Sequence, residues 1–221
     1  MTALPARDYA AFLFDMDGTI LTSIIAAERV WAAWARSHGL DVDVFLPTIH
    51  GKRSIDTVRG VGLPDIDVEA EAQRITLAEI EDVEGIEAIA GVAAFLATLP
   101  SDRWAIVTSA PRALAEARIA AAGLPTPPVM VAAEDVQRGK PAPDPFLLGA
   151  EKLGMRPQDC LVFEDTLAGL QSAEAAGMDS IVVTATHHEP LETEVTGVPD
   201  YDDLRAIRTP EGLLRLQRTR S

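Results

Sequence analysis

The sequence predicts an α/β fold with a doubly wound parallel-sheet core and an inserted all-helical domain. Short apolar runs alternate with helix-like stretches along most of the chain, a pattern typical of a parallel sheet covered on both faces. Residues 22–90 differ, because they carry helical patterns and no convincing strand. We therefore expect residues 1–21 and 91–221 to form the α/β core, and residues 22–90 to form a helical domain inserted after the first strand.

Apolar runs are the candidates for the core strands. A run of this length does not distinguish a strand from a buried helix by periodicity alone. Some of the runs, however, end at a polar residue followed by a helix-like stretch, as strands do in β-α-β units. These are Ala11–Phe14, Trp104–Val107 and Cys160–Phe163, and further candidates are Val129–Val131 and Ser180–Val183.

The core helices are predicted from the segments between these strands. One of them has Pro111 where a first helical residue is expected and Gly123 at its end, an order typical of helix boundaries. Gly154 and Gly177 end two others. The expected core helices are Gly91–Leu99, Pro111–Ala122, Phe146–Leu153 and Leu167–Ala176.

The inserted segment has a helical pattern of its own. Trp31 and Trp34 share one face of a helix that ends before Gly39, and we expect both to pack inside the inserted domain. The helices expected here are Ile24–His38, Ser54–Arg59 and Val68–Val83, the last of which is rich in glutamate.

The composition narrows the classes of partner. With 48% hydrophobic and 24% charged residues, the chain is typical of a globular protein, and no apolar run approaches the roughly 20 residues that cross a membrane. The formal net charge of −15 would repel nucleic acid and anionic membranes, so we expect neither as a partner. A single cysteine, Cys160, excludes an intramolecular disulfide, and we expect a cytoplasmic protein.

The arginines near the end are interpreted as a solvated helix face or a frayed terminus: Arg205, Arg208, Arg215, Arg218 and Arg220.

Polar side chains follow the predicted strands where each strand ends. Because ligands of an open parallel sheet bind beyond the carboxyl ends of its strands, we expect these side chains to converge. Acids so close together stay ionised only if a cation holds them, and carboxylate oxygens with water suit Mg²⁺. With a lysine and two hydroxyls, such a site would position and neutralise a phosphoryl group. The residues concerned are Asp15, Asp17, Thr108, Ser109, Lys140, Glu164 and Asp165.

Four motifs in order resemble those of the haloacid dehalogenase-like (HAD) superfamily. The resemblance covers the chain up to about residue 190, and the helical insertion resembles the cap domain of that family. It implies a Rossmann-like core with the cap inserted after the first strand. The motifs are Asp15-Met16-Asp17-Gly18-Thr19, Val107-Thr108-Ser109, Gly139-Lys140-Pro141-Ala142-Pro143-Asp144 and Phe163-Glu164-Asp165-Thr166-Leu167-Ala168-Gly169.

The resemblance implies a role for each of these residues. Asp15 would attack phosphorus and become an aspartyl-phosphate, and Asp17 would protonate the leaving alkoxide and then activate water. Thr108 and Ser109 would hold the phosphoryl oxygens, and Lys140 would pair with the nucleophile and the phosphate. The implied Mg²⁺ ligands are the Asp15 carboxylate, the Asp17 backbone carbonyl and Asp165, with Glu164 either a direct ligand or behind one.

Among members of the family, the chain looks most like bacterial sugar phosphatases, which implies a small phosphorylated sugar or polyol as substrate. The run His50-Gly51-Lys52-Arg53-Ser54 is similar to the cap loop that sets specificity in such enzymes. We therefore expect Gly51, Lys52 and Arg53 to contact the substrate, whose hydroxyls and phosphate suit a basic loop.

Three alternatives stay open to test. Haloacid dehalogenases lack the second acid of the first motif, so Asp17 disfavours that activity. A phosphohexomutase of the β-phosphoglucomutase type typically has a histidine at the position of Ala27, which puts mutase chemistry in doubt. A catalytically idle binding protein would have lost one of the motif residues, and none is lost. The oligomeric state is either monomer or dimer.

Overall fold

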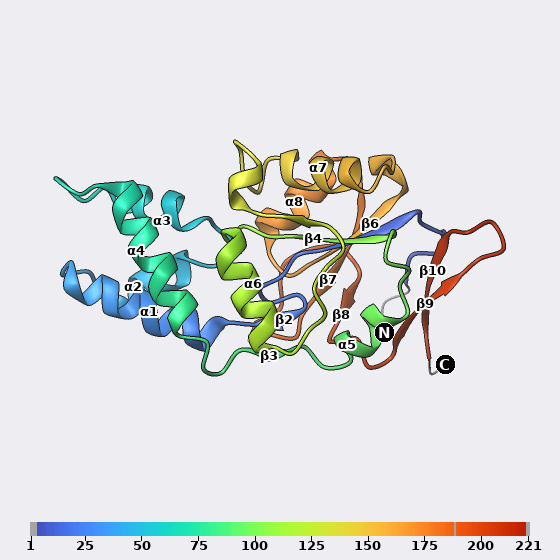
Figure 1. The fold of residues 1–221 in the computed structure, drawn as a ribbon, viewed down its shortest axis with the longest axis horizontal. Helices are drawn as coiled ribbons and strands as arrows, with labels where there is room; N and C mark the ends of the chain where they lie inside the picture. The colour runs from blue at the N-terminus through green and yellow to red at the C-terminus, as the bar shows by residue number, and fades with distance from the viewer. Residues whose placement is uncertain (1–3, 188, 220–221) are drawn as a thin grey trace.

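The computed structural model, which describes residues 4–187 and 189–219, confirms the α/β class (Figure 1). All the strands of the main sheet are parallel, in the order β5-β4-β1-β6-β7-β8. Each predicted strand is present to within a residue of its expected bounds. Because β4 and β6 flank β1, the carboxyl ends of these three strands lie together. The strands are β1 (Ala11–Phe14), β4 (Trp104–Val107), β5 (Met130–Val131), β6 (Cys160–Glu164), β7 (Asp179–Val183) and β8 (Gly197–Val198).

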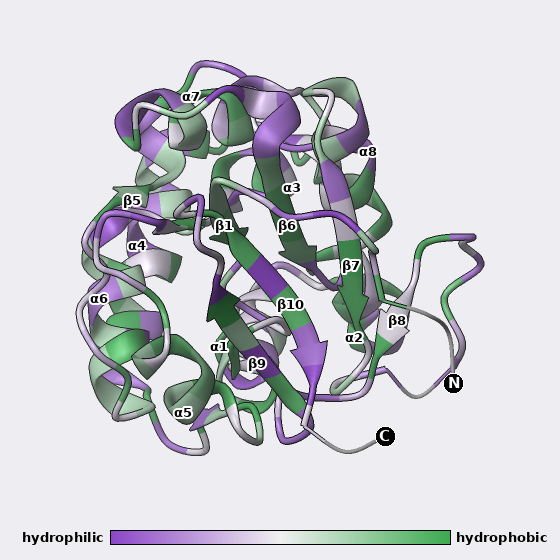
Figure 2. Cartoon of the chain, turned by 90° about the vertical axis from the view of Figure 1, so that its right-hand side faces the viewer, coloured by the Kyte–Doolittle hydropathy of each residue, from purple (hydrophilic) through white to green (hydrophobic). Residues whose placement is uncertain are grey.

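Helices cover both faces of this sheet, as a doubly wound fold requires. Along β1, Phe12 and Phe14 enter the hydrophobic layer beneath α5 and α6, whereas Leu13 enters the opposite layer beneath α7 and α8. The central strands β1 and β6 are apolar up to Glu164, the last residue of β6 (Figure 2). The helices are α5 (Val92–Ala97), α6 (Arg112–Ala121), α7 (Asp144–Lys152) and α8 (Leu167–Ala175).

Aromatic packing fixes the strand ends that carry the acids. Phe14 and Phe163 are paired in register on β1 and β6, and their rings stack with centroids 4.7 Å apart. Each of these buried residues directly precedes an acidic residue, Asp15 or Glu164. The layer under the sheet therefore sets the positions of both carboxylates.

Residues 24–81 form a separate helical layer, on the left in Figure 1, that we call the cap. Trp31 and Trp34 pack against Phe45 in a hydrophobic cluster of its own, as the sequence predicts. A two-stranded ribbon that the sequence did not reveal, β2 (Leu21–Thr22) with β3 (Glu87–Ala88), joins the cap to the core. The cap helices are α1 (Ile24–Ser37), α2 (Val42–Phe45), α3 (Ser54–Val61) and α4 (Val68–Glu81).

The interpretation of the C-terminal arginines as a helix face or frayed end was wrong. The segment is an antiparallel hairpin of β9 (Leu204–Arg208) and β10 (Leu214–Arg218). Leu214 and Leu216 are buried and Arg215 between them is exposed, and apolar and polar residues alternate at the start of β10 (Figure 2). The arginines Arg205, Arg208, Arg215 and Arg218 lie on these two strands, and Arg220 lies outside the described residues.

Within residues 4–187 and 189–219, no helix combines the length and apolar character needed to span a membrane.

Candidate active site

A buried lysine ties together the acids at the ends of β1 and β6. The Lys140 Nζ donates hydrogen bonds to Asp15 Oδ1, to Glu164 Oε1 at 2.7 Å and to the Val107 carbonyl oxygen at 3.1 Å. Its side chain is 2% exposed. A buried ammonium group is stable only among such partners, so Lys140 holds the ends of three neighbouring strands in one arrangement.

Glu164 is held on all sides. Its Oε2 accepts hydrogen bonds from the backbone N–H groups of Asp165 and Thr166, both at 2.7 Å, and from Thr166 Oγ1 at 3.0 Å. With Oε1 bound to Lys140, both oxygens are engaged. Gly169 makes room for this carboxylate, since a Cβ at that position would lie 1.7 Å from Glu164 Oε1.

Gly169→Ala is therefore expected to disturb the site, although alanine favours a helix over glycine. The new methyl group would displace Glu164 from Lys140 and from the start of α8. Because the sequence predicts Mg²⁺ at these acids, we expect kcat/KM to fall about 10-fold or more and the metal concentration for half-maximal activity to rise. Steady-state kinetics over a Mg²⁺ titration would measure both.

The matched control is Gly60→Ala, within α3, where an added Cβ would contact nothing within 4 Å. We expect this variant to keep wild-type kinetics. Wild-type metal dependence in Gly169→Ala would show that the position of Glu164 does not affect metal binding.

Three carboxylates form the strongest candidate metal site among the described residues. One oxygen each from Asp15, Glu164 and Asp165 can be chosen so that all lie within 4.8 Å of one another. Burial raises the pKa of Asp15 to about 7, and burial together with Glu164 and Asp15 raises that of Asp165 well above its usual range. The raised pKa values mean that the ionised carboxylates are unfavourable in this buried site without a nearby cation. Oxygen donors of this kind fit a hard divalent cation.

Within this cluster, Asp15 and Asp165 are better placed than Glu164 to bind a metal, because both Glu164 oxygens are engaged. Asp165 lies against Gly18, where a Cβ would come within 2.0 Å of its Oδ2. The Thr19 hydroxyl lies 3.3 Å from Asp165 Oδ1, and His187 Nε2 lies 2.8 Å from its carbonyl oxygen.

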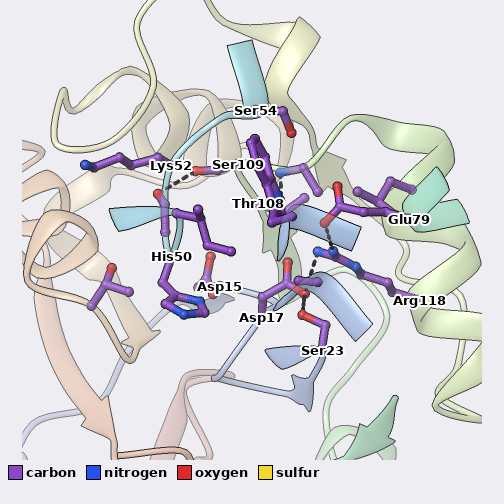
Figure 3. Close-up of a pocket in the computed structure, with 17 residues that line it drawn as sticks. Asp15, Asp17, Ser23, His50, Lys52, Ser54, Glu79, Thr108, Ser109 and Arg118 are labelled. Atoms are coloured by element: carbon purple, nitrogen blue, oxygen red, sulfur yellow. Dashed lines mark hydrogen bonds and ion pairs between the residues drawn. The ribbon is translucent and has the colours of Figure 1, made fainter. Parts of the chain in front are cut away.

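Asp17 lies in the same cavity as Asp15, but its carboxylate faces a different set of partners (Figure 3). The Oδ1 atom accepts hydrogen bonds from Ser23 Oγ at 2.5 Å and from Arg118 Nη1 at 2.9 Å. The other end of the guanidinium, Nη2, donates to Glu79 Oε1 at 2.8 Å. Burial raises the pKa of Glu79 to about 7, against the opposing effect of Arg118.

The cap loop covers this cavity. Its lining includes His50, Gly51 and Lys52 from the cap and Thr108 and Ser109 from the core. The Ser109 hydroxyl donates to the Gly51 carbonyl oxygen at 3.2 Å, which ties the loop to the end of β4. Gly51 has a φ of +73° and leaves only 3.0 Å between an added Cβ and Thr166 Cγ2. Glycine thus allows the loop to approach the core closely.

Arg53, the third residue expected to contact substrate, does not line this cavity. Its guanidinium pairs with Asp56 in the first turn of α3, which Arg53 directly precedes, with Nε 2.6 Å from Oδ2. Its Nη1 donates to the Gln137 carbonyl oxygen at 3.2 Å, so the side chain bridges the cap to the loop that carries Lys140.

Arg118 and Glu79 are the residues that the motifs did not reveal. On α6, Arg118 falls among the buried positions 114, 115 and 119. On α4, Glu79 follows the buried Ala72 and Ile75. A charged residue in the apolar stripe of an amphipathic helix is the sequence signal that could have found both.

Comparison with known proteins settles the family. A model of the haloacid dehalogenase-like hydrolases matches residues 9–177. The chain belongs to this hydrolase family. It is 44% identical over 211 residues to hexitol phosphatase A of Escherichia coli, covering 93% of this chain and 98% of that protein. It is also 35% identical to the Escherichia coli fructose-1-phosphate phosphatase YqaB, covering 79% of this chain and 96% of that protein. The prediction of a HAD-like hydrolase that acts as a phosphatase is thus confirmed.

Solved structures show the same fold at lower identity. A β-phosphoglucomutase from Clostridium difficile superposes with a TM-score of 0.75 at 21% identity, covering 87% of this chain and 91% of that one. CbbY from Rhodobacter sphaeroides, solved with phosphate, superposes with a TM-score of 0.72 at 23% identity, covering 87% and 95%. Similarity at this level confirms the HAD fold of this hydrolase and carries no statement about its substrate.

Proposed function

We propose that this HAD hydrolase is a Mg²⁺-dependent phosphatase that hydrolyses small phosphorylated sugars or polyols through an aspartyl-phosphate. The observation that carries the proposal is the buried cluster of Asp15, Lys140, Glu164 and Asp165. Asp15 of this cluster lines a cavity that polar residues of the cap loop also line. The names of the relatives, a hexitol phosphatase and a fructose-1-phosphate phosphatase, support a polyhydroxylated substrate.

The proposed reaction has two steps. An oxygen of Asp15 attacks phosphorus, the bond from phosphorus to the sugar oxygen breaks, and Asp17 gives its proton to the departing alkoxide. Water then attacks the aspartyl-phosphate and gives a proton back to Asp17, which releases phosphate and restores Asp15. Thr108 and Ser109, at the end of β4, would hold the phosphoryl oxygens, and Lys140 would neutralise negative charge on them.

Asp15 and Asp165 would hold the Mg²⁺, with the Asp17 backbone carbonyl as the further ligand proposed from the motif, and Glu164 would orient the site from behind. A bound Mg²⁺ supplies positive charge for the phosphoryl oxygens and offsets the repulsion among the acids. Since burial raises the pKa of Asp15 to about 7, metal binding should release protons near neutral pH.

We further propose that the inserted domain comprises residues 22–90, the cap helices with their connections, and that residues 1–21 and 91–221 form the core. Gly51 and Lys52 would face the substrate. The Lys52 ammonium group would bond substrate hydroxyls or phosphate. Cap opening would admit substrate, and closure would exclude water. That the enzyme is a monomer or a dimer, and that it acts in the cytoplasm, are predictions from the sequence.

Phosphate release from a panel of hexitol, hexose and glycerol phosphates tests this function. We expect turnover of at least one polyhydroxylated phosphate, no activity after EDTA treatment and recovery on addition of Mg²⁺. Mg²⁺ should also raise the Tm of the EDTA-treated protein, because it binds only the folded site. Activity that survives EDTA would contradict the metal-dependent mechanism.

The alternative function is a phosphohexomutase of the β-phosphoglucomutase type. Ala27 lines the cavity at the position where the mutase motif has histidine, so no imidazole is available from that position. Faster interconversion of hexose 1- and 6-phosphates than phosphate release would favour the mutase over the phosphatase.

A further inference from the structure

Two donors clamp one oxygen of the Asp17 carboxylate. Ser23 Oγ and Arg118 Nη1 both donate to Oδ1, whereas none of the described residues makes a hydrogen bond to Oδ2. Ser23 occupies the N-cap position of α1, yet its side chain makes no cap hydrogen bond and turns to Asp17 instead. The clamp therefore fixes the plane of the carboxylate and leaves Oδ2 free for proton transfer in the cavity (Figure 3).

Arg118 is itself held from the cap. Its guanidinium bridges Asp17 of the core and Glu79 of α4, and the Arg118 and Glu79 side chains are only 7% and 4% exposed. A planar guanidinium can donate to two carboxylates from different nitrogens at once, which a lysine ammonium cannot do with the same rigidity. The bridge exists only when α4 lies against α6, that is, with the cap on the core.

We propose that Arg118 is a positioning residue for Asp17, and that Glu79 fixes Arg118 from the cap, so that Asp17 is correctly aimed only in the closed enzyme. The inference rests on the proposed phosphatase function, and on the role of Asp17 as proton donor to the leaving group. Cap closure would then have a catalytic consequence, because it brings Glu79 to Arg118 and thereby orients Asp17.

The test is Arg118→Met, with kcat/KM measured on an alkyl phosphate that the wild type hydrolyses and on p-nitrophenyl phosphate. The p-nitrophenolate group leaves without help from an acid, whereas a sugar or polyol alkoxide needs a proton. Since kcat/KM reports the steps up to cleavage of the substrate P–O bond, hydrolysis of the aspartyl-phosphate does not affect it. We expect a loss of about 10²-fold on the alkyl phosphate and of less than about 5-fold on p-nitrophenyl phosphate.

Milder variants keep the test decisive if Arg118→Met does not fold. Glu79→Gln retains a hydrogen-bond acceptor for Arg118, and Arg118→Lys retains the positive charge. Both should show a smaller loss with the same preference for the aryl phosphate. Arg112→Met is the matched control, because Arg112 lies on the same helix but pairs with Asp135 outside the cavity. We expect wild-type values for both substrates in that variant.

Equal losses on the two substrates in Arg118→Met and Glu79→Gln would overturn the inference and reduce Arg118 to a structural role. A weaker dissociation constant for the alkyl phosphate, with an unchanged single-turnover rate of P–O cleavage, would overturn it as well, because Arg118 would then bind substrate hydroxyls. A wild type that hydrolyses neither phosphate would instead refute the proposed phosphatase itself, so the two failures are distinguishable.

Discussion

Asp15→Asn is expected to lower kcat/KM by about 10⁴-fold or more, because an amide oxygen is a far weaker nucleophile than a carboxylate. The substitution keeps the volume of a side chain that is buried at the end of β1. It also removes one carboxylate from the repelling group of Asp15, Glu164 and Asp165, and burial has already raised the pKa of Asp15 to about 7. We therefore expect the Tm of the metal-free protein to stay equal or to rise while activity is lost.

Phosphate release and a thermal unfolding scan in EDTA would measure the two effects on one preparation. Asp8→Asn is the matched control, because Asp8 pairs with Arg215 on the surface of the hairpin, far along the sheet from the site. That variant should keep full activity. Substantial turnover by Asp15→Asn would show that another residue makes the attack.

The core was predictable because its local and long-range requirements agree. Runs such as Trp104–Val107 and Cys160–Phe163 are apolar throughout, as strands buried on both faces must be, and glycines mark the helix ends. The C-terminal hairpin was not predictable in the same way. Its outward-facing arginines, Arg205 and Arg215 among them, hide the alternation, and its strand β10 pairs through Leu214 with Tyr9, near the other end of the chain.

The candidate site also has a part that the sequence predicts and a part that it does not. Asp15, Lys140 and Asp165 follow from motifs after strands, because the carboxyl ends of parallel strands converge wherever the helices lie. The partners of Asp17 do not follow from motifs. Arg118 and Glu79 meet only because α4 of the cap packs on α6 of the core, a docking that no local pattern encodes.

Lys140→Met is expected to lower kcat/KM by about 10³-fold, because a donor aimed at both the nucleophile and the phosphate is lost. The variant should also be less stable by about 3 kcal/mol at pH 8, since it leaves Asp15 and Glu164 buried without their cation. Lys140 at present lowers the pKa of Asp15 against burial, so its removal would raise that pKa further above 7.

The sign of the pH dependence follows from that shift. A carboxyl with a pKa higher in the folded than in the unfolded protein keeps its proton on folding, so stability falls as the pH rises between the two values. In Lys140→Met this decline should extend above pH 7, and the Tm difference from the wild type in EDTA should grow from pH 6 to pH 8. Lys152→Met is the control, because Lys152 pairs with Asp135 at the surface of α7 and away from the cavity. A Tm difference independent of pH would contradict this explanation, because the loss of stability would then not come from ionisation of the buried Asp15.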